Sequence, residues 1–134
     1  MLVVIDTNVL VSALWSKNGA PARLVSLAIS GALVPCYDYR IMCEYRDVLR
    51  RPRFGFSEGE INALLDWIET CGRSVVADYI DVPFVDEEDR KFYEVAQLCR
   101  AVLVTGNIKH FPADPIVITV NDFLDRYGSV DGDK

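Results

Sequence analysis

The feature that most constrains the fold is the opening of the chain, where residues 2–5 (LVVI) run directly into Asp6, Thr7 and Asn8. An apolar run without polar alternation indicates a strand that is buried on both faces, as strands of parallel sheets are. In open α/β sheets, ligands bind outside the carboxyl ends of the strands. Asp6 therefore lies where we expect a functional site.

Further strand patterns alternate with helical patterns along the rest of the chain. The expected strands cover residues 32–37, 74–77, 101–105 and 116–120. Strands separated by helices predict an α/β fold, with helices on both faces of a central parallel sheet in a three-layer α/β/α sandwich. We interpret residues 1–128 as a single domain and expect the polar tail, residues 129–134, to be disordered.

Side chains suited to capping mark where several helices begin. Thr7 or Asn8 is expected to cap the first helix, Asp38 a helix after the strand at 32–37, and Asn121 the last helix. Ser57 begins a capping box, with a glutamate three residues later.

Composition narrows the class of protein. No apolar run reaches the ~20 residues that span a membrane, and the N-terminus lacks the pattern of a signal peptide, so we expect a cytoplasmic protein with no membrane partner. Four scattered cysteines and one histidine argue against a zinc site or a disulfide framework and favour buried free thiols.

The net charge is −6, but residues 40–53 form a local basic patch. This stretch contains five arginines but only two acids, Glu44 and Asp47. The patch is either a solvated helix face or a track for phosphate groups. On the second interpretation, Arg46, Arg50 and Arg51 are candidate contacts to RNA.

Several acids are expected to meet at the edge of the sheet that holds Asp6. Glu44 lies beside the apolar stripe of its helix, although a surface pair with Arg40 is an alternative. Asp86 and Asp89 begin a helix that a right-handed crossover places at the same edge, although Asp86 could simply cap that helix.

Carboxylates gathered in one pocket raise each other's pKa unless a cation is present. Oxygen ligands favour Mg²⁺ or Mn²⁺ over zinc. A metal of this kind activates water for attack on a phosphodiester. The acids, together with Asn107 after the strand at 101–105, thus predict a metal-dependent nuclease site.

The ordered set of motifs resembles PIN-domain proteins, and more narrowly the toxin components of VapC-like toxin–antitoxin systems. The motifs are Asp6-Thr7-Asn8, Glu44, Asp86-x-x-Asp89, Val104-Thr105-Gly106-Asn107 and Lys109-His110-Phe111-Pro112, and the resemblance extends over residues 2 to about 124.

The resemblance implies a Rossmann-like fold with strand order 3-2-1-4-5 and a ribonuclease that uses Mg²⁺ or Mn²⁺. Asp6, Glu44 and Asp89 would be its principal acids, with Thr7 and Thr105 orienting them or the water. Asn107 stands where the family often has aspartate, which leaves open whether one metal or two is bound. The resemblance also implies single-stranded RNA as substrate, a cognate antitoxin and a homodimer.

Other interpretations remain beside this one. The chain could be a weak or inactive PIN-like module that binds RNA or an antitoxin, or a receiver-like signalling domain. We expect His110 to be structural, since lone loop histidines usually are. Trp15 and Trp67 are expected to lie in the core or to face a partner rather than to stack on bases.

Overall fold

The computed structural model describes residues 1–128; the predicted disordered tail lies outside the described residues. The strands are β1 (Leu2–Ile5), β2 (Val34–Tyr37), β3 (Arg73–Ser74), β4 (Val102–Val104) and β5 (Val117–Ile118). The helices are α1 (Thr7–Trp15), α2 (Ala20–Ile29), α3 (Tyr39–Leu49), α4 (Glu58–Cys71), α5 (Arg90–Cys99) and α6 (Val120–Phe123). Short 3₁₀ turns cover Pro52–Phe54, Glu87–Asp89 and Ile108–His110, and a π-helical turn covers Leu124–Gly128.

The five strands are all parallel and lie in the order β3-β2-β1-β4-β5. This arrangement confirms the predicted three-layer α/β/α sandwich and its strand order. A receiver-like domain has the order 2-1-3-4-5, so the topology excludes that alternative.

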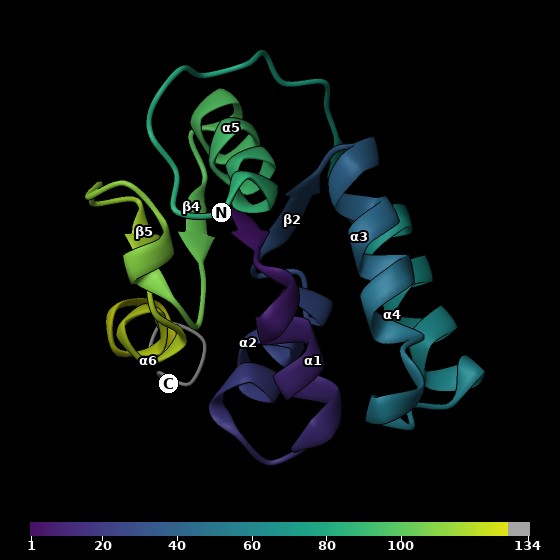
Figure 1. Ribbon diagram of the computed structural model, residues 1–134. Coiled ribbons are helices and arrows are strands. Elements are labelled where there is room, and N and C mark those ends of the chain that lie inside the picture. The colour runs from purple at the N-terminus through teal and green to yellow at the C-terminus, as the bar shows by residue number, and fades with distance from the viewer. Residues whose placement is uncertain (129–134) are drawn as a thin grey trace.

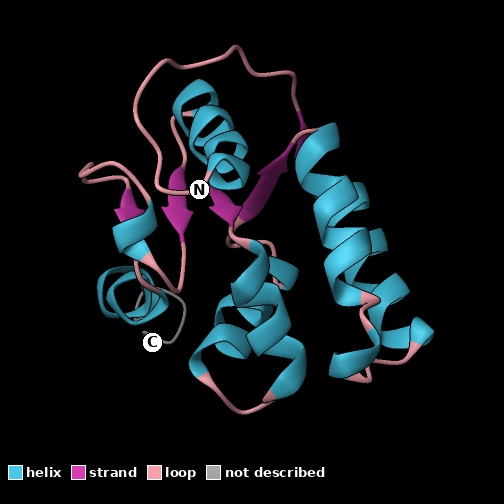
Figure 2. Ribbon diagram, viewed as in Figure 1, coloured by secondary structure: helices cyan, strands magenta, loops and turns pink. Residues whose placement is uncertain are grey.

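The helices enclose the sheet from several sides. Figure 1 shows α3 and α4 side by side along one flank, and α1 with α2 at the end of the molecule toward which the chain leaves β1. The stretch between β3 and α5 has no strand and no helix before its 3₁₀ turn, and it passes over the opposite end as a long loop (Figure 2).

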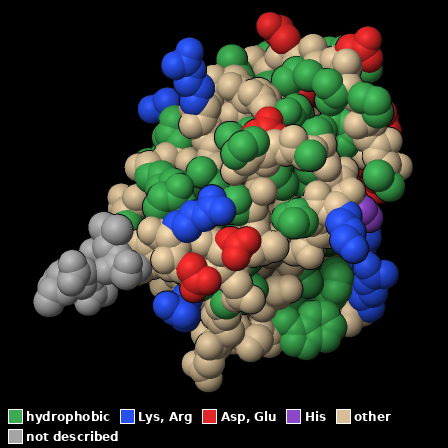
Figure 3. Space-filling view, turned by 90° about the vertical axis from the view of Figure 1, so that its left-hand side faces the viewer, with side chains coloured by type: hydrophobic (Ala, Val, Ile, Leu, Met, Phe, Trp, Pro, Cys, Tyr) green, Lys and Arg blue, Asp and Glu red, His purple; other side chains and the backbone are tan. Residues whose placement is uncertain are grey.

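The core is centred on β1, the middle strand. Val3, Val4 and Ile5 are at most 1% exposed, and Leu103 of β4 and Phe92 of α5 are fully buried beside them. Burying one such side chain contributes about 1.5–3 kcal/mol. The face shown in Figure 3 carries side chains of both charges, with basic side chains next to one another at its right edge. No helix within residues 1–128 has the length and apolarity needed to cross a membrane.

Local capping explains two helix starts as predicted. The Asp38 carboxylate accepts a hydrogen bond from the Ile41 backbone N–H at 2.9 Å, and Ser57 with Glu60 forms the capping box of α4.

The prediction that Thr7 or Asn8 caps α1 is wrong, because α1 begins at Thr7 and has no side-chain cap. The Thr7 hydroxyl donates to Glu44 instead, and the Asn8 side chain accepts from the Gly106 N–H at 3.3 Å. Near the other end of the chain, Thr119 rather than Asn121 caps α6. The Thr119 hydroxyl accepts a hydrogen bond from the backbone N–H two residues after the first residue of that helix.

Two further expectations need correction. The edge strand expected over 74–77 is the two-residue β3 (Arg73–Ser74), after which only the Val75 N–H still bonds to β2, at the Tyr37 carbonyl. The cysteines are free as predicted, but Cys36 alone is buried and Cys71 is exposed.

Candidate active site

The adjacent strands β1 and β4 bring together two polar side chains that are far apart in the sequence. Ile5 is in register with Val104, so the next residues, Asp6 and Thr105, are neighbours beyond the ends of their strands. The Thr105 hydroxyl donates to Asp6 Oδ2 at 2.7 Å, and the two residues are only 0% and 6% exposed, respectively. The position of Asp6 is thus fixed by the sheet itself.

Glu44 reaches the same place from α3. The Thr7 hydroxyl donates to the Glu44 carboxylate, and the Tyr45 hydroxyl donates to the Ile5 carbonyl. The Asp38 cap fixes where the helix starts. Two side-chain contacts therefore hold the middle of α3 against the end of β1.

The third acid and the amide are linked through the imidazole of His110. Nδ1 of His110 lies 3.3 Å from Asp89 Oδ2, and Nε2 lies 3.0 Å from Asn107 Nδ2. The tautomer with a proton on Nδ1 satisfies both contacts, because it donates to Asp89 and accepts from Asn107. The Asn107 backbone N–H also donates to Thr105 Oγ1 at 3.0 Å, which joins this chain of contacts to Asp6.

These side chains surround one pocket of about 300 Å³. Its walls include six side chains named from the sequence: Asp6, Thr7, Asn8, Glu44, Asp89 and Asn107. Thr105 lies behind Asp6, while Asp86 accepts a hydrogen bond from the Glu88 N–H at 3.0 Å, which is a capping arrangement. Asp86 lines an adjacent cavity of about 860 Å³.

Crowding of the acids changes how they ionise. The pKa of Asp6 is raised from 3.8 to about 6, first by burial and then by the charges of Asp89 and Glu44, against the effect of the Thr105 hydrogen bond. The pKa of Asp89 is also raised, by burial and by the charge of Asp86. The pocket therefore disfavours several negative charges without a cation.

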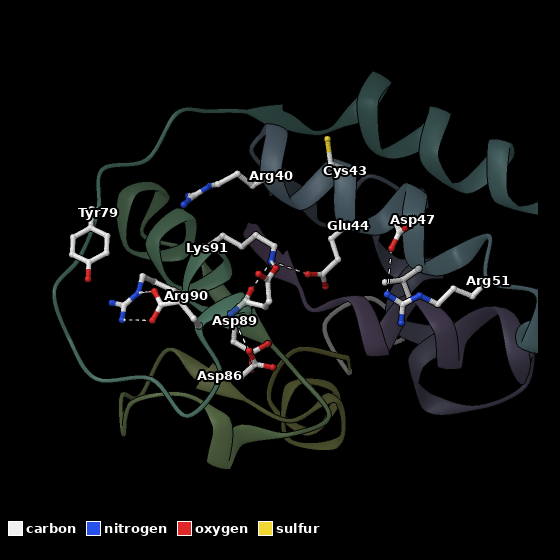
Figure 4. A pocket seen from close by; sticks show the side chains of 13 residues that line it. Arg40, Cys43, Glu44, Asp47, Arg51, Tyr79, Asp86, Asp89, Arg90 and Lys91 are labelled. Atoms are coloured by element: carbon white, nitrogen blue, oxygen red, sulfur yellow. Dashed lines mark hydrogen bonds and ion pairs between the residues drawn. The ribbon is translucent and has the colours of Figure 1, made fainter.

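One cation within the protein already lies beside these acids. Lys91 Nζ is 2.7 Å from Glu44 Oε1, and the Lys91 side chain is 8% exposed (Figure 4). No pattern in the sequence singles out this residue, since a lysine among the acids at a helix start resembles a solvated surface pair. Arg40, the expected partner of Glu44, instead pairs with Asp38 at 2.6 Å and with Glu94 at 2.8 Å.

The donor chemistry of the pocket fits a hard divalent cation, because three carboxylates and an amide supply only oxygen ligands. The arrangement is open, however. Within residues 1–128, no three acidic, histidine or cysteine side chains gather closely enough to hold a metal ion. The candidate ligands thus line one pocket without enclosing a common point.

Two of the three arginines predicted to contact RNA face away from this pocket, toward α4. Arg46 pairs with Glu69 at 2.8 Å, and Arg50 pairs with Glu58 at 3.1 Å. Neither arginine lines the pocket or the adjacent cavity.

The other arginines of the basic patch lie closer to the site. Arg51 pairs with Asp47 at 3.2 Å and lines the adjacent cavity. Arg53 lines the pocket itself, with its guanidinium carbon 4.9 Å from the centre of the Phe54 ring. The charge pattern of the sequence indicated this segment, but it did not single out Arg53 as the arginine that lines the acidic pocket.

Similarity to known proteins extends over most of the chain. Residues 2–109 match the PIN domain. Over 108 residues the chain is 31% identical to an uncharacterized protein of Methanocaldococcus jannaschii, covering 78% of this chain and 70% of that protein. No solved structure was found to match. The chain belongs to the PIN domain family, whose members are generally nucleases.

Proposed function

We propose that this protein is an endoribonuclease that hydrolyses phosphodiesters of single-stranded RNA with Mg²⁺ or Mn²⁺. The observation that carries the proposal is the pocket in which Asp6, Glu44, Asp89 and Asn107 meet at the carboxyl edge of the sheet. The elevated pKa of Asp6 supports it, since burial and the charges of Asp89 and Glu44 raise that pKa and a divalent ion would stabilise the ionised carboxylate.

In this proposal the three carboxylates and the Asn107 carbonyl oxygen would hold the metal. A bound divalent ion supplies an activated water and offsets the charge that develops on the phosphate. Thr105 orients the Asp6 carboxylate, and Thr7 orients that of Glu44. His110 holds Asp89 and Asn107 at a fixed separation, so it is a positioning residue.

Cleavage of a labelled single-stranded RNA with Mn²⁺ tests the activity. We expect Asp6→Asn to lower the rate at least about 100-fold, because it removes a charge that no neighbour replaces. Ser57→Ala, on a helix that carries no pocket residue, is the control. Cleavage that persists in EDTA, or that Asp6→Asn leaves unchanged, would refute the proposal.

A second candidate is a PIN-like module that binds RNA or an antitoxin without cutting. Two observations favour it: Asn107 brings no charge to the pocket, and Lys91 already neutralises Glu44. Calorimetry that detects no Mn²⁺ binding while RNA still binds would support this candidate. Cleavage gained on Asn107→Asp would instead indicate a nuclease with a weakened metal site.

The toxin role, the antitoxin and the homodimer belong to the same proposal. The resemblance to VapC-like toxins supports them, and an acidic pocket suits an arginine side chain from an inhibitory partner. Expression without a partner should then arrest bacterial growth, and Asp6→Asn should relieve the arrest. Equal arrest by both proteins would argue against RNA cleavage as its cause, and sedimentation would establish the oligomeric state.

A further inference from the structure

An aromatic cluster lies where α1 meets the 3₁₀ turn after α3. The ring of Trp15 contacts Phe54 and Phe56 edge-on, with centroid separations of 5.6 and 6.2 Å, while the two phenylalanine rings stack on each other. Trp15 is nevertheless 63% exposed, so the core, one of the two places expected for it, is wrong. A large aromatic side chain at the end of a helix thus presents most of its surface to solvent, although it has apolar neighbours.

The cluster is continuous with the acidic pocket. Thr7, Val11 and Trp15 follow one another at intervals of four residues and so share one face of α1. Thr7 and Val11 line the pocket together with Phe54 of the aromatic cluster. At 1.5 Å per residue, Trp15 lies about 12 Å along the helix from Thr7. A polymer held at the acids would pass this ring.

One positively charged side chain belongs both to the wall of the acidic pocket and to the surroundings of the aromatic cluster. Arg53 lines the pocket and covers one face of Phe54. Within residues 1–128 no carboxylate is within ion-pair distance of Arg53, whereas Arg46, Arg50 and Arg51 are all paired. Its guanidinium is therefore free to bind a phosphate group.

We propose that Trp15 stacks on an unpaired nucleobase of the bound strand outside the acidic pocket, while Arg53 binds a phosphate of the same strand. The choice of RNA as ligand rests on the proposed function. An aromatic surface beside a basic side chain is the combination that binds single strands, because stacking needs a base that is not paired. This subsite would make the enzyme favour single strands and bases that stack strongly.

Binding can be measured in EDTA, so that the test does not depend on cleavage. The chain has two tryptophans, so in a Trp67→Phe background, excitation at a wavelength that tyrosine does not absorb reports on Trp15 alone. Short oligoadenylate should quench this fluorescence, whereas an abasic strand of the same length and a duplex should not. Quenching by the abasic strand to the same extent would overturn the proposal.

Affinities of single-site variants separate the two contacts. Trp15→Leu keeps an apolar side chain against Phe54 and Phe56, and it should weaken oligoadenylate binding about 5- to 100-fold without affecting the abasic strand. Arg53→Gln should weaken the binding of both strands. Tyr39→Ala removes an aromatic side chain that is 78% exposed and lines neither cavity, and it should change nothing.

The outcomes distinguish this inference from the proposed function. Base-dependent quenching without any cleavage in Mn²⁺ would refute the nuclease and support the subsite. Cleavage with an affinity that Trp15→Leu leaves unchanged would support the nuclease and overturn the subsite. A wild-type protein that binds an apolar peptide on Trp15 but no oligoadenylate would also overturn it.

Discussion

At the scale of single residues, Asp6 is a carboxylate whose surroundings disfavour its charge. Burial above all, and then the charges of Asp89 and Glu44, raise its pKa to about 6, while the Thr105 hydroxyl stabilises its ionised form. A carboxylate is kept in such a place at a cost to stability. This cost can be measured, because it depends on pH.

We expect the stability of the metal-free protein to fall between about pH 4 and pH 6 through the ionisation of Asp6. In this range the folded state binds more protons than the unfolded state, whose pKa is near 3.8, so the free energy of unfolding decreases as the pH rises. A shift of about two units corresponds to about 3 kcal/mol at most.

Asp6→Asn removes this titration and keeps an oxygen that can accept the Thr105 hydrogen bond. Urea denaturation in EDTA should find the variant more stable than wild type at pH 7, by a margin that shrinks toward pH 4. A margin that does not change with pH would contradict the burial argument.

Lys91 provides the second prediction at this scale. Lys91→Met keeps the length of the side chain but leaves Glu44 without its cation, so we expect a loss of about 1–3 kcal/mol in EDTA. Added Mn²⁺ should then stabilise the variant more than wild type. Arg51→Met is the matched control, since it breaks an exposed pair between Asp47 of α3 and Arg51 just beyond that helix, worth under about 1 kcal/mol. Equal losses of stability in the two variants would show that the Lys91–Glu44 pair contributes no more than an exposed ion pair.

At the scale of elements, the start of α3 determines where Glu44 lies. Asp38→Ala removes the cap of α3 and should cost about 1–2 kcal/mol. It should also lower cleavage and Mn²⁺ affinity, because Glu44 is presented on the helix that this cap positions. Ser57→Ala removes a comparable cap from α4 and should lower stability without affecting Mn²⁺ binding. If both variants lose Mn²⁺ affinity equally, general destabilisation rather than position is the cause.

The elements also show what the sequence could predict. Buried strands such as β1 and β4 and the caps at Asp38 and Ser57 follow from adjacent residues, so local patterns identify them. Strand β3 does not, because only two of its residues pair with β2 and no hydrophobic pattern marks so short an edge strand.

The same limit applies to the site. The acids at the strand ends could be named because parallel topology brings such ends together. The Lys91–Glu44 pair, the bridge through His110 and the unpaired Arg53 depend on how α3, α5 and their turns pack. Such packing brings side chains into contact that no local pattern in the sequence indicates.

At the scale of the whole molecule, the strand order creates the pocket. The hydrogen bond from Thr105 to Asp6 spans 99 residues of sequence, and it forms because β4 crosses back to lie beside β1. The proposed function therefore rests on the claim that this topology would place Asp6, Glu44, Asp89 and Asn107 around a divalent metal. Lys91 would then share Glu44 with the ion.

A crystal soaked in Mn²⁺ and measured for anomalous scattering tests this claim most directly. We predict a manganese peak in the pocket, with oxygens of Asp6 and Asp89 among its ligands at about 2.0–2.3 Å, and no such peak in Asp6→Asn. Manganese bound elsewhere only, or a pocket without metal in which Lys91 still pairs with Glu44, would contradict the proposed metal site.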